Sequence, residues 1–413
     1  MRSPLPLLAL TLSLSCATVP GSSEHGRRIE LPELRVVAQP IGPDGLEVYD
    51  AETLFQRALD FLDGDAYADA AWYFERLIRE FPEDRRVPLA HYNRAVAYIH
   101  LERGDEAVVA IDKYLAMLKE TASTKDRLDG RFKRGQALAV AKRYDEVATH
   151  FDELLGEELT PEDRIEALVD AGVGHYMLGA HDSEGPHRYT AEYRFLEARR
   201  LYRKASETAR LDVAYFIAQA AFYLAEIARL EFSEKKLAFP SAAAIADAQL
   251  QAQQRAAKGA VPPEVTLEKL LGEQLEEKCQ RLLRAQYAYL RTIREEHPGW
   301  ASASGYNVGQ MYLQLHDEMV QLPTPADLTA EQAALYQKVV RKRVMILLTK
   351  AQQTWSSTVD MVTRTGAESE WAVRTRDSLE QLRQKLLEES SATADVDNEG
   401  NDIATTPAGS GAS

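Results

Sequence analysis

The sequence has little cysteine, with only Cys16 and Cys279 among its 413 residues, so a disulfide framework is excluded. Positive charge is also scarce, because 49 Lys and Arg face 64 Asp and Glu and leave a net charge of −15. This excess of negative charge repels phosphate backbones, and we expect no nucleic-acid partner. Downstream of the N-terminus, no apolar run approaches the roughly 18 residues of a membrane-spanning helix.

Catalytic motifs are missing as well. The sequence contains no Gly-rich phosphate loop, no His-Glu-x-x-His, no paired-cysteine motif and no nucleophile elbow. We therefore predict a protein that is not an enzyme and holds no cofactor. His181 and His187 flank the acidic stretch 182–184, but two histidines in a loop without a fixed scaffold are usually solvated, and we predict no metal site.

The N-terminus has the features of an export signal. Arg2 precedes a short apolar stretch, Leu5 to Leu14, which ends at Ser15-Cys16. Leu14-Ser15-Cys16 resembles a bacterial lipobox, although Ser13 stands where that pattern prefers Leu. The resemblance implies that residues 1–15 are a lipoprotein signal peptide and that Cys16 is lipidated. With Ala17 next, it also implies an outer-membrane protein that faces the periplasm. The alternative is a plain secretory signal with an incidental cysteine.

Two segments lack the composition of a folded core. Residues 16–50 are broken by prolines and glycines, and we predict a flexible tether. Residues 390–413 contain acidic but no basic or aromatic residues, which predicts a disordered acidic tail. Cys279 falls in a strongly helical stretch, where we expect a buried and unpaired thiol.

Between these ends the sequence repeats itself. Small and large apolar residues recur at one spacing in three copies: Ala58, Phe61, Ala70 and Phe74; Ala95, Tyr98, Ala107 and Ile111; Gly135, Leu138, Val147 and Phe151. This pattern resembles the tetratricopeptide repeat (TPR), a helix pair of about 34 residues in which small residues let two helices approach. The resemblance implies an all-α fold, an α-α superhelix that forms a TPR-like solenoid over residues 51–389.

Later copies keep the apolar face but lengthen the connections. We predict insertions near 180–188 and 233–263, the second with an extra exposed helix, and divergent, longer helix pairs toward the C-terminus. Thr329 and Gln332 form a capping-box signature before a helix that continues to about Gly366. A highly charged last helix from Ser369 to Glu389 suits the end of a solenoid.

The TPR resemblance implies that the first helix of each pair lines a concave groove. The fifth repeat position and residues one turn on supply the predicted partner-binding side chains, which are Phe55, Leu59, Tyr92, Val96, Phe132, Val169, Ile217 and Tyr306. Such a groove suits an extended or helical peptide with apolar anchors. Alternatively, these side chains pack within the core or against the tether, because apolar stripes at helical spacing are often core.

As a whole the chain resembles the exported TPR lipoproteins of Gram-negative envelope assembly, motility and secretion complexes. That resemblance implies a periplasm-facing scaffold or adaptor, lipid-anchored in the membrane, that binds other envelope proteins or peptides. The alternatives are a carrier module for peptides or solutes and an accessory factor of a cell-wall enzyme.

Overall fold

The regular secondary structure of the described residues is all α-helical. The computed structural model describes residues 49–118, 123–180, 185–256, 264–325 and 328–394, and these ranges hold fourteen helices and no strand. The signal, Cys16, nearly all of the tether and the tail from residue 395 lie outside the described residues. The all-α prediction is confirmed, and no described helix is both long and apolar enough to cross a bilayer.

The described residues divide into two compact units. Unit 1 extends to Gly179 and includes Tyr189–Arg194, whereas unit 2 contains Ala180–Arg188 and the chain from Phe195 onward. Helix α8 (Pro186–Ala205) therefore contributes to both units.

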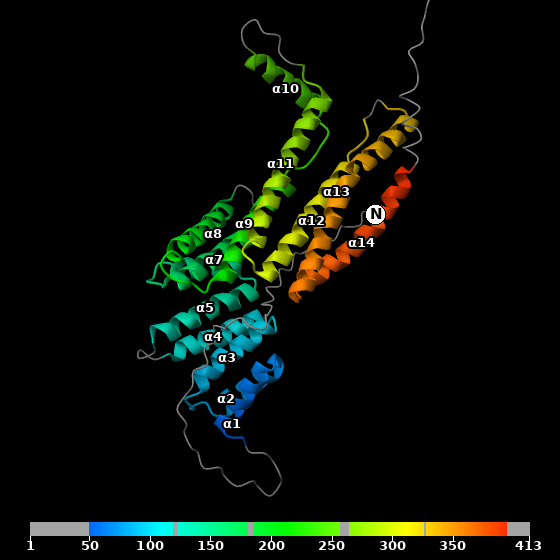
Figure 1. The fold of residues 1–413 in the computed structure, drawn as a ribbon. Helices are drawn as coiled ribbons and strands as arrows, with labels where there is room; N and C mark the ends of the chain where they lie inside the picture. The colour runs from blue at the N-terminus through cyan, green and yellow to red at the C-terminus, as the bar shows by residue number, and fades with distance from the viewer. Residues whose placement is uncertain (1–48, 119–122, 181–184, 257–263, 326–327, 395–413) are drawn as a thin grey trace, which may run out of the picture. The chain divides into compact units, whose positions relative to one another are not determined.

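Unit 1 is a stack of helix pairs in chain order (Figure 1). Its helices are α1 (Ala51–Asp63), α2 (Tyr67–Glu80), α3 (Val87–His100), α4 (Gly104–Met117), α5 (Thr124–Val140), α6 (Tyr144–Leu154) and α7 (Pro161–Gly179). Each helix packs on the next, and α3 also contacts α5, which in turn contacts α7. First helices of successive pairs therefore lie side by side, as in a TPR-like solenoid.

Small residues and rings make the contact within each pair. The Ala58, Ala70 and Phe74 side chains are fully buried between α1 and α2. In the third pair, a Cβ atom added to Gly135 would lie only 2.2 Å from the Phe151 ring, so glycine is required for this close approach. The recurrence that identifies the repeats is therefore a packing requirement.

The turns within the pairs repeat as well. Asp65, Glu102 and Lys142 all have left-handed backbones, with φ of 59°, 57° and 59°, at the junctions of α1–α2, α3–α4 and α5–α6. This conformation costs a non-glycine residue roughly 1–2 kcal/mol. Its recurrence at one place in three consecutive pairs shows that the helix geometry fixes the turn more strongly than the local residue does.

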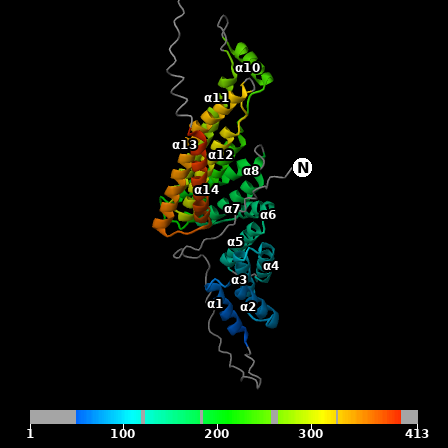
Figure 2. The ribbon, with the colours of Figure 1, turned by 90° about the vertical axis from the view of Figure 1, so that its right-hand side faces the viewer.

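Unit 2 has longer helices. It contains most of α8, followed by α9 (Ala214–Glu234), α10 (Ala242–Arg255), α11 (Leu267–Ile293), α12 (Pro298–Val320), α13 (Ala330–Thr365) and α14 (Glu370–Thr393). Helix α11 packs on both α9 and α12, and α12 packs on α13 and α14, which lie side by side in Figures 1 and 2. Helix α10 has no buried residue and is the extra exposed helix predicted in the second insertion.

Caps fix several helix starts as the sequence indicates. The Thr329 hydroxyl accepts a hydrogen bond from the Gln332 backbone N–H at 3.3 Å. The Gln332 side-chain oxygen accepts one from the Thr329 backbone N–H at 2.9 Å, which completes the capping box of α13. Gly366 ends that helix with a left-handed φ of 66°. Helix α14 begins after its Ser369 cap and continues to Thr393, four residues past the predicted end.

Two residues of α11 have an exposure that their sequence neighbours do not indicate. Lys278, which follows the charged residues Glu276 and Glu277, is 0 % exposed. Cys279, predicted to be buried, is a free thiol of intermediate exposure. The pairing of α11 with both α9 and α12 turns Lys278 inward and leaves its neighbour nearer the surface, which helical periodicity alone does not reveal.

Replacing Gly309 by alanine is expected to destabilise the protein by about 2–3 kcal/mol, because the added methyl group overpacks the core of unit 2. The new Cβ would lie 2.1 Å from Nε1 of Trp355, a fully buried ring whose N–H donates to the Tyr306 carbonyl at 2.9 Å. Chemical denaturation measures the loss. Gly272→Ala is the matched control, because a Cβ there meets nothing within 4 Å. The control should be neutral or stabilising, and equal stability of both variants would contradict this packing.

Candidate functional site

The first helices of unit 1, α1, α3, α5 and α7, form one side of the unit, which we call the A face. Phe55, Leu59, Tyr92 and Val96 are half-buried on this side. Phe132 and Val169 are instead interior, with exposures of 7 % and 0 %. A partner can reach the first four side chains but not the last two.

The half-buried rings of the A face are supported from beneath by rings of the second helices. Phe55 meets Phe74 edge-on at 5.8 Å between centroids, and Tyr92 meets Tyr114 edge-on at 5.1 Å. These contacts hold the rings in one orientation, so that binding requires little further ordering. One side of each ring thus packs within the core, as the alternative interpretation of these residues predicts, while the other side remains accessible.

One acidic side chain of α7, Glu166, lies near the Tyr92 ring. Glu166 and Asp170 are four residues apart and therefore lie on one helix face. Neither forms an ion pair with a basic side chain within the described parts of the chain. Asp129 of α5 and Tyr92 of α3 lie near enough for their charges to interact with Glu166. The A face thus carries carboxylates of α5 and α7 near the Tyr92 ring of α3.

Burial and like charge both act on this pair. Burial raises the pKa of Glu166, and the negative charges of Asp170, Asp163 and Asp129 raise it further, whereas Lys133 opposes the rise. Burial also raises the pKa of Asp170. The pKa of the Tyr92 phenol is raised by burial and by the Asp129 and Glu166 carboxylates. All three shifts mean that negative charge at this place is poorly compensated.

A site of this kind attracts a cation. Carboxylates that repel one another become more favourable when an ammonium or guanidinium group lies between them. A bound metal ion fits less well, because the described residues contain no cluster of three or more His, Cys, Asp or Glu with suitable geometry. The chemistry of the A face therefore suits a Lys or Arg side chain next to an apolar one.

Glu166 and Asp170 are not among the residues predicted from the sequence. The predicted groove residue of this repeat is Val169, which lies in the core. One signal was present, since both acids lie inside the otherwise apolar run Ile165–Val173, where a charged residue has little access to water.

Unit 2 presents the remaining predicted groove residues differently. Ile217 of α9 is only 3 % exposed and belongs to the core. Tyr306 of α12 is half-buried between two indole rings, with centroids 6.3 Å from Trp355 and 5.5 Å from Trp371. Trp371 belongs to α14, so the terminal helix of the chain already covers part of this position.

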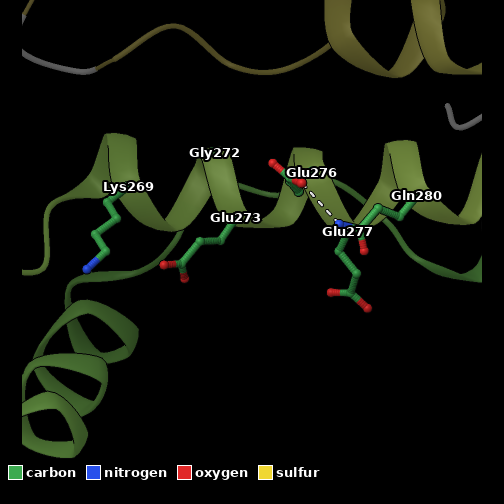
Figure 3. A pocket seen from close by; sticks show the side chains of 6 residues that line it. All are labelled: Lys269, Gly272, Glu273, Glu276, Glu277 and Gln280. Atoms are coloured by element: carbon green, nitrogen blue, oxygen red, sulfur yellow. Dashed lines mark hydrogen bonds between the residues drawn. The ribbon is translucent and has the colours of Figure 1, made fainter.

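A hollow on α11 is an open surface. Figure 3 shows its lining, which comes from this one helix and comprises Lys269, Gly272, Glu273, Glu276, Glu277 and Gln280. A wall made by a single helix leaves a small ligand exposed to water, so we assign no ligand site to it. Cys16 and His181, which entered the lipidation and metal arguments, lie outside the described residues.

Comparisons with known proteins add little to these observations. No protein-family model and no curated protein matches the sequence. Among solved structures, the chain is similar to a Rap protein complexed with competence and sporulation factor, with 14 % identity, 82 % of this chain and 76 % of that chain covered, and a TM-score of 0.35. It is also similar to a tetratricopeptide repeat protein from Parabacteroides merdae, with 15 % identity, 77 % and 99 % coverage, and a TM-score of 0.36. At these TM-scores neither likeness supports an argument about function. The stacked helix pairs themselves show that the chain is an all-α, TPR-like solenoid.

Proposed function

We propose that the protein is an adaptor whose A face binds an extended segment of a partner protein. The observation that carries the proposal is the poorly compensated pair Glu166 and Asp170, with Glu166 near the pre-positioned Tyr92 ring. Structural carboxylates are normally paired or fully solvated, and a half-buried pair with raised pKa values is a mark of a functional site.

The site geometry defines the partner chemistry. The half-buried side chains of Phe55, Leu59, Tyr92 and Val96 offer apolar contacts on α1 and α3, while the acid pair lies two repeats further along on α7. A segment that combines apolar anchors with a Lys or Arg on one side satisfies both requirements. A free C-terminal carboxylate would be repelled by the acid pair.

Capture from envelope extracts tests this proposal. The full chain should retain a partner that Glu166→Gln/Asp170→Asn loses, because the amides remove the attraction for a cation without changing side-chain size. Asp69→Asn/Glu75→Gln is the matched control, since it removes two negative charges from exposed positions of α2. Retention of the same partners by the acid-pair variant would exclude the A face as the binding site.

We further propose that the adaptor acts in the cell envelope, anchored by lipid at Cys16 in the outer membrane and facing the periplasm. The lipobox resemblance of Leu14-Ser15-Cys16 and the apolar stretch before it support this part of the proposal. Cys16→Ala should move the protein from the membrane fraction to the soluble periplasmic fraction, as measured by detergent phase partition. An unchanged distribution would argue for another mode of attachment.

A further inference from the structure

Helix α8 has one exposed side, which we call its outer face. The side chains of this face are two tyrosines, a leucine and three basic residues, namely Tyr189, Tyr193, Leu196, Arg200, Arg203 and Lys204. With about 3.6 residues per turn, all six fall within about 100° of arc around the helix axis. The opposite side of α8 holds Ala191, Phe195 and Ala198, which are fully buried. Helix α8 therefore packs through one side and presents the outer face to solvent.

The outer face is one surface because α8 is one continuous helix. Tyr189 and Tyr193 belong to unit 1 and Leu196 to unit 2, yet the helix itself fixes the spacing of these side chains. The face is about 23 Å long from Tyr189 to Lys204, at about 1.5 Å of rise per residue. Its N-terminal half is apolar and aromatic, with exposures of 66 % for Tyr189, 59 % for Tyr193 and 51 % for Leu196, and its C-terminal half is basic.

The basic side chains of the outer face have no acidic counterpart. Arg200, Arg203 and Lys204 are exposed and form no ion pair within the described residues. By contrast Arg199, which lies outside the arc, pairs with Glu295 at 2.8 Å. No acidic residue of α8 falls within the arc. Two arginines and one lysine thus give the outer face a charge of +3, although the whole chain has a net charge of −15.

Tyrosines and a basic cluster on one exposed helix face are the features of a helix that lies on an anionic bilayer. Tyrosine rings favour the headgroup region, and Arg and Lys side chains bind the lipid phosphates. The convex face of a single helix offers no groove for a protein segment, whereas it can lie flat on a membrane. At physiological ionic strength the Debye length is about 8 Å, so acidic residues elsewhere in the chain are largely screened from this contact.

We infer that the outer face of α8 binds the surface of a bilayer that contains anionic phospholipid. The lipid anchor proposed at Cys16 supports this choice of occupant. Only residues 17–48 separate Cys16 from the described chain, and they span at most about 110 Å when fully extended. A bilayer would therefore always be within reach of α8, and even a weak contact would be populated. For this proximity, and for nothing else, we rely on the proposed anchor.

Vesicle flotation tests the contact on the chain from residue 16 onward, with Cys16→Ala so that no lipid is attached. Phosphatidylcholine vesicles that contain phosphatidylglycerol should bind the chain, and vesicles of phosphatidylcholine alone should bind it about tenfold less or weaker. The variant Arg200→Gln/Arg203→Gln/Lys204→Gln should weaken binding by about a hundredfold, at about fivefold for each charge removed.

The matched control is Lys125→Gln/Arg255→Gln/Arg343→Gln, which removes the same charge from exposed positions of α5, α10 and α13. This control should bind vesicles as the wild type does, because its three positions do not share a face. Circular dichroism confirms that each variant is folded.

A ring variant supplies the second arm. Tyr193→Ser should weaken binding to the anionic vesicles by about fivefold or more, because it removes apolar area from the contact. Trp72→Ser, at a comparably exposed ring of α2 (53 % against 59 %), should leave binding unchanged.

A chain that binds neither kind of vesicle, or binds both equally, would overturn the inference, and so would a triple variant of α8 that binds as tightly as its control. If the wild type binds no vesicle but captures an acidic protein that the triple variant loses, the outer face is a protein contact instead. The vesicle assay uses a chain without lipid and leaves Glu166 and Asp170 intact. Its failure is therefore distinct from a failure of the proposed anchor or of the A face.

Discussion

Replacing Lys278 by alanine is expected to lower the free energy of unfolding by about 3–5 kcal/mol, the range found when one partner of a buried charge pair is removed. The Lys278 ammonium donates to the carbonyl oxygens of Phe232 at 2.8 Å and Lys235 at 2.7 Å, and it lies 2.9 Å from a Glu318 oxygen. It thereby caps the C-terminal end of α9 from α11 and pairs with α12. Its loss leaves two carbonyl groups and a carboxylate without this donor.

Chemical denaturation measures this effect, and hydrogen exchange at the end of α9 locates it. Lys278→Met keeps most of the side-chain volume and should lower the free energy of unfolding nearly as much as Lys278→Ala. This variant separates the effect of losing the charge from the effect of creating a cavity. Lys236→Ala is the matched control, because that side chain is 68 % exposed and its ammonium lies 3.7 Å from the same Glu318, and the substitution should change the stability little. A loss below about 1 kcal/mol for Lys278→Ala would contradict the capping role.

The double variant Glu166→Gln/Asp170→Asn is expected to stabilise the protein at pH 8 by about 2 kcal/mol and to leave it nearly unchanged at pH 4. Because the folded chain raises the pKa of both carboxyl groups, the folded state holds their protons more tightly than the unfolded state does. The resulting stability is complete below the unfolded pKa values and is lost as the pH rises through the folded ones. The Gln and Asn side chains do not titrate in this pH range, so the variant does not lose this stability as the pH rises.

Thermal unfolding between pH 4 and pH 9 checks this expectation. Asp69→Asn/Glu75→Gln removes the same charge from the exposed side of α2 and should reproduce the wild-type pH profile. A pH profile of the acid-pair variant that runs parallel to the wild type would show that the two carboxyl groups have ordinary pKa values.

The same acid pair links stability to the proposed function. A change expected to stabilise the empty protein is also expected to remove the partner, which is the usual relation between stability and a binding site. With a Lys or Arg of the partner bound, the wild-type protein should be the more stable of the two. A cation beside the carboxylates lowers their pKa and makes the charged form favourable.

The sequence predicted the solenoid well because its signals are local. Small and large apolar residues three or four positions apart mark the packing face of each helix, and across one pair Gly135 of α5 meets Phe151 of α6. Caps such as Thr329 with Gln332 are likewise read within one turn. Even the exposed helix α10 follows from a composition that buries nothing.

The site was harder to predict because burial is not local. Glu166 and Asp170 have the spacing of an ordinary solvated helix face, and packing of α7 on helices of an earlier repeat leaves both side chains half-buried. The burial of Lys278 is non-local in the same way, since the carbonyl groups that accept its hydrogen bonds belong to residues more than 40 positions earlier.

Photocrosslinking in intact cells tests the adaptor role most directly. A photoreactive residue at Leu59 or Val96, half-buried on the A face, should yield an adduct with another envelope protein, while the same residue at Trp72, an exposed position of α2, should not. Mass spectrometry of the adduct identifies the attached segment, which we expect to be apolar with a Lys or Arg. Adducts formed only with residues 17–48 of the same chain, or formed only from position 72, would contradict the account.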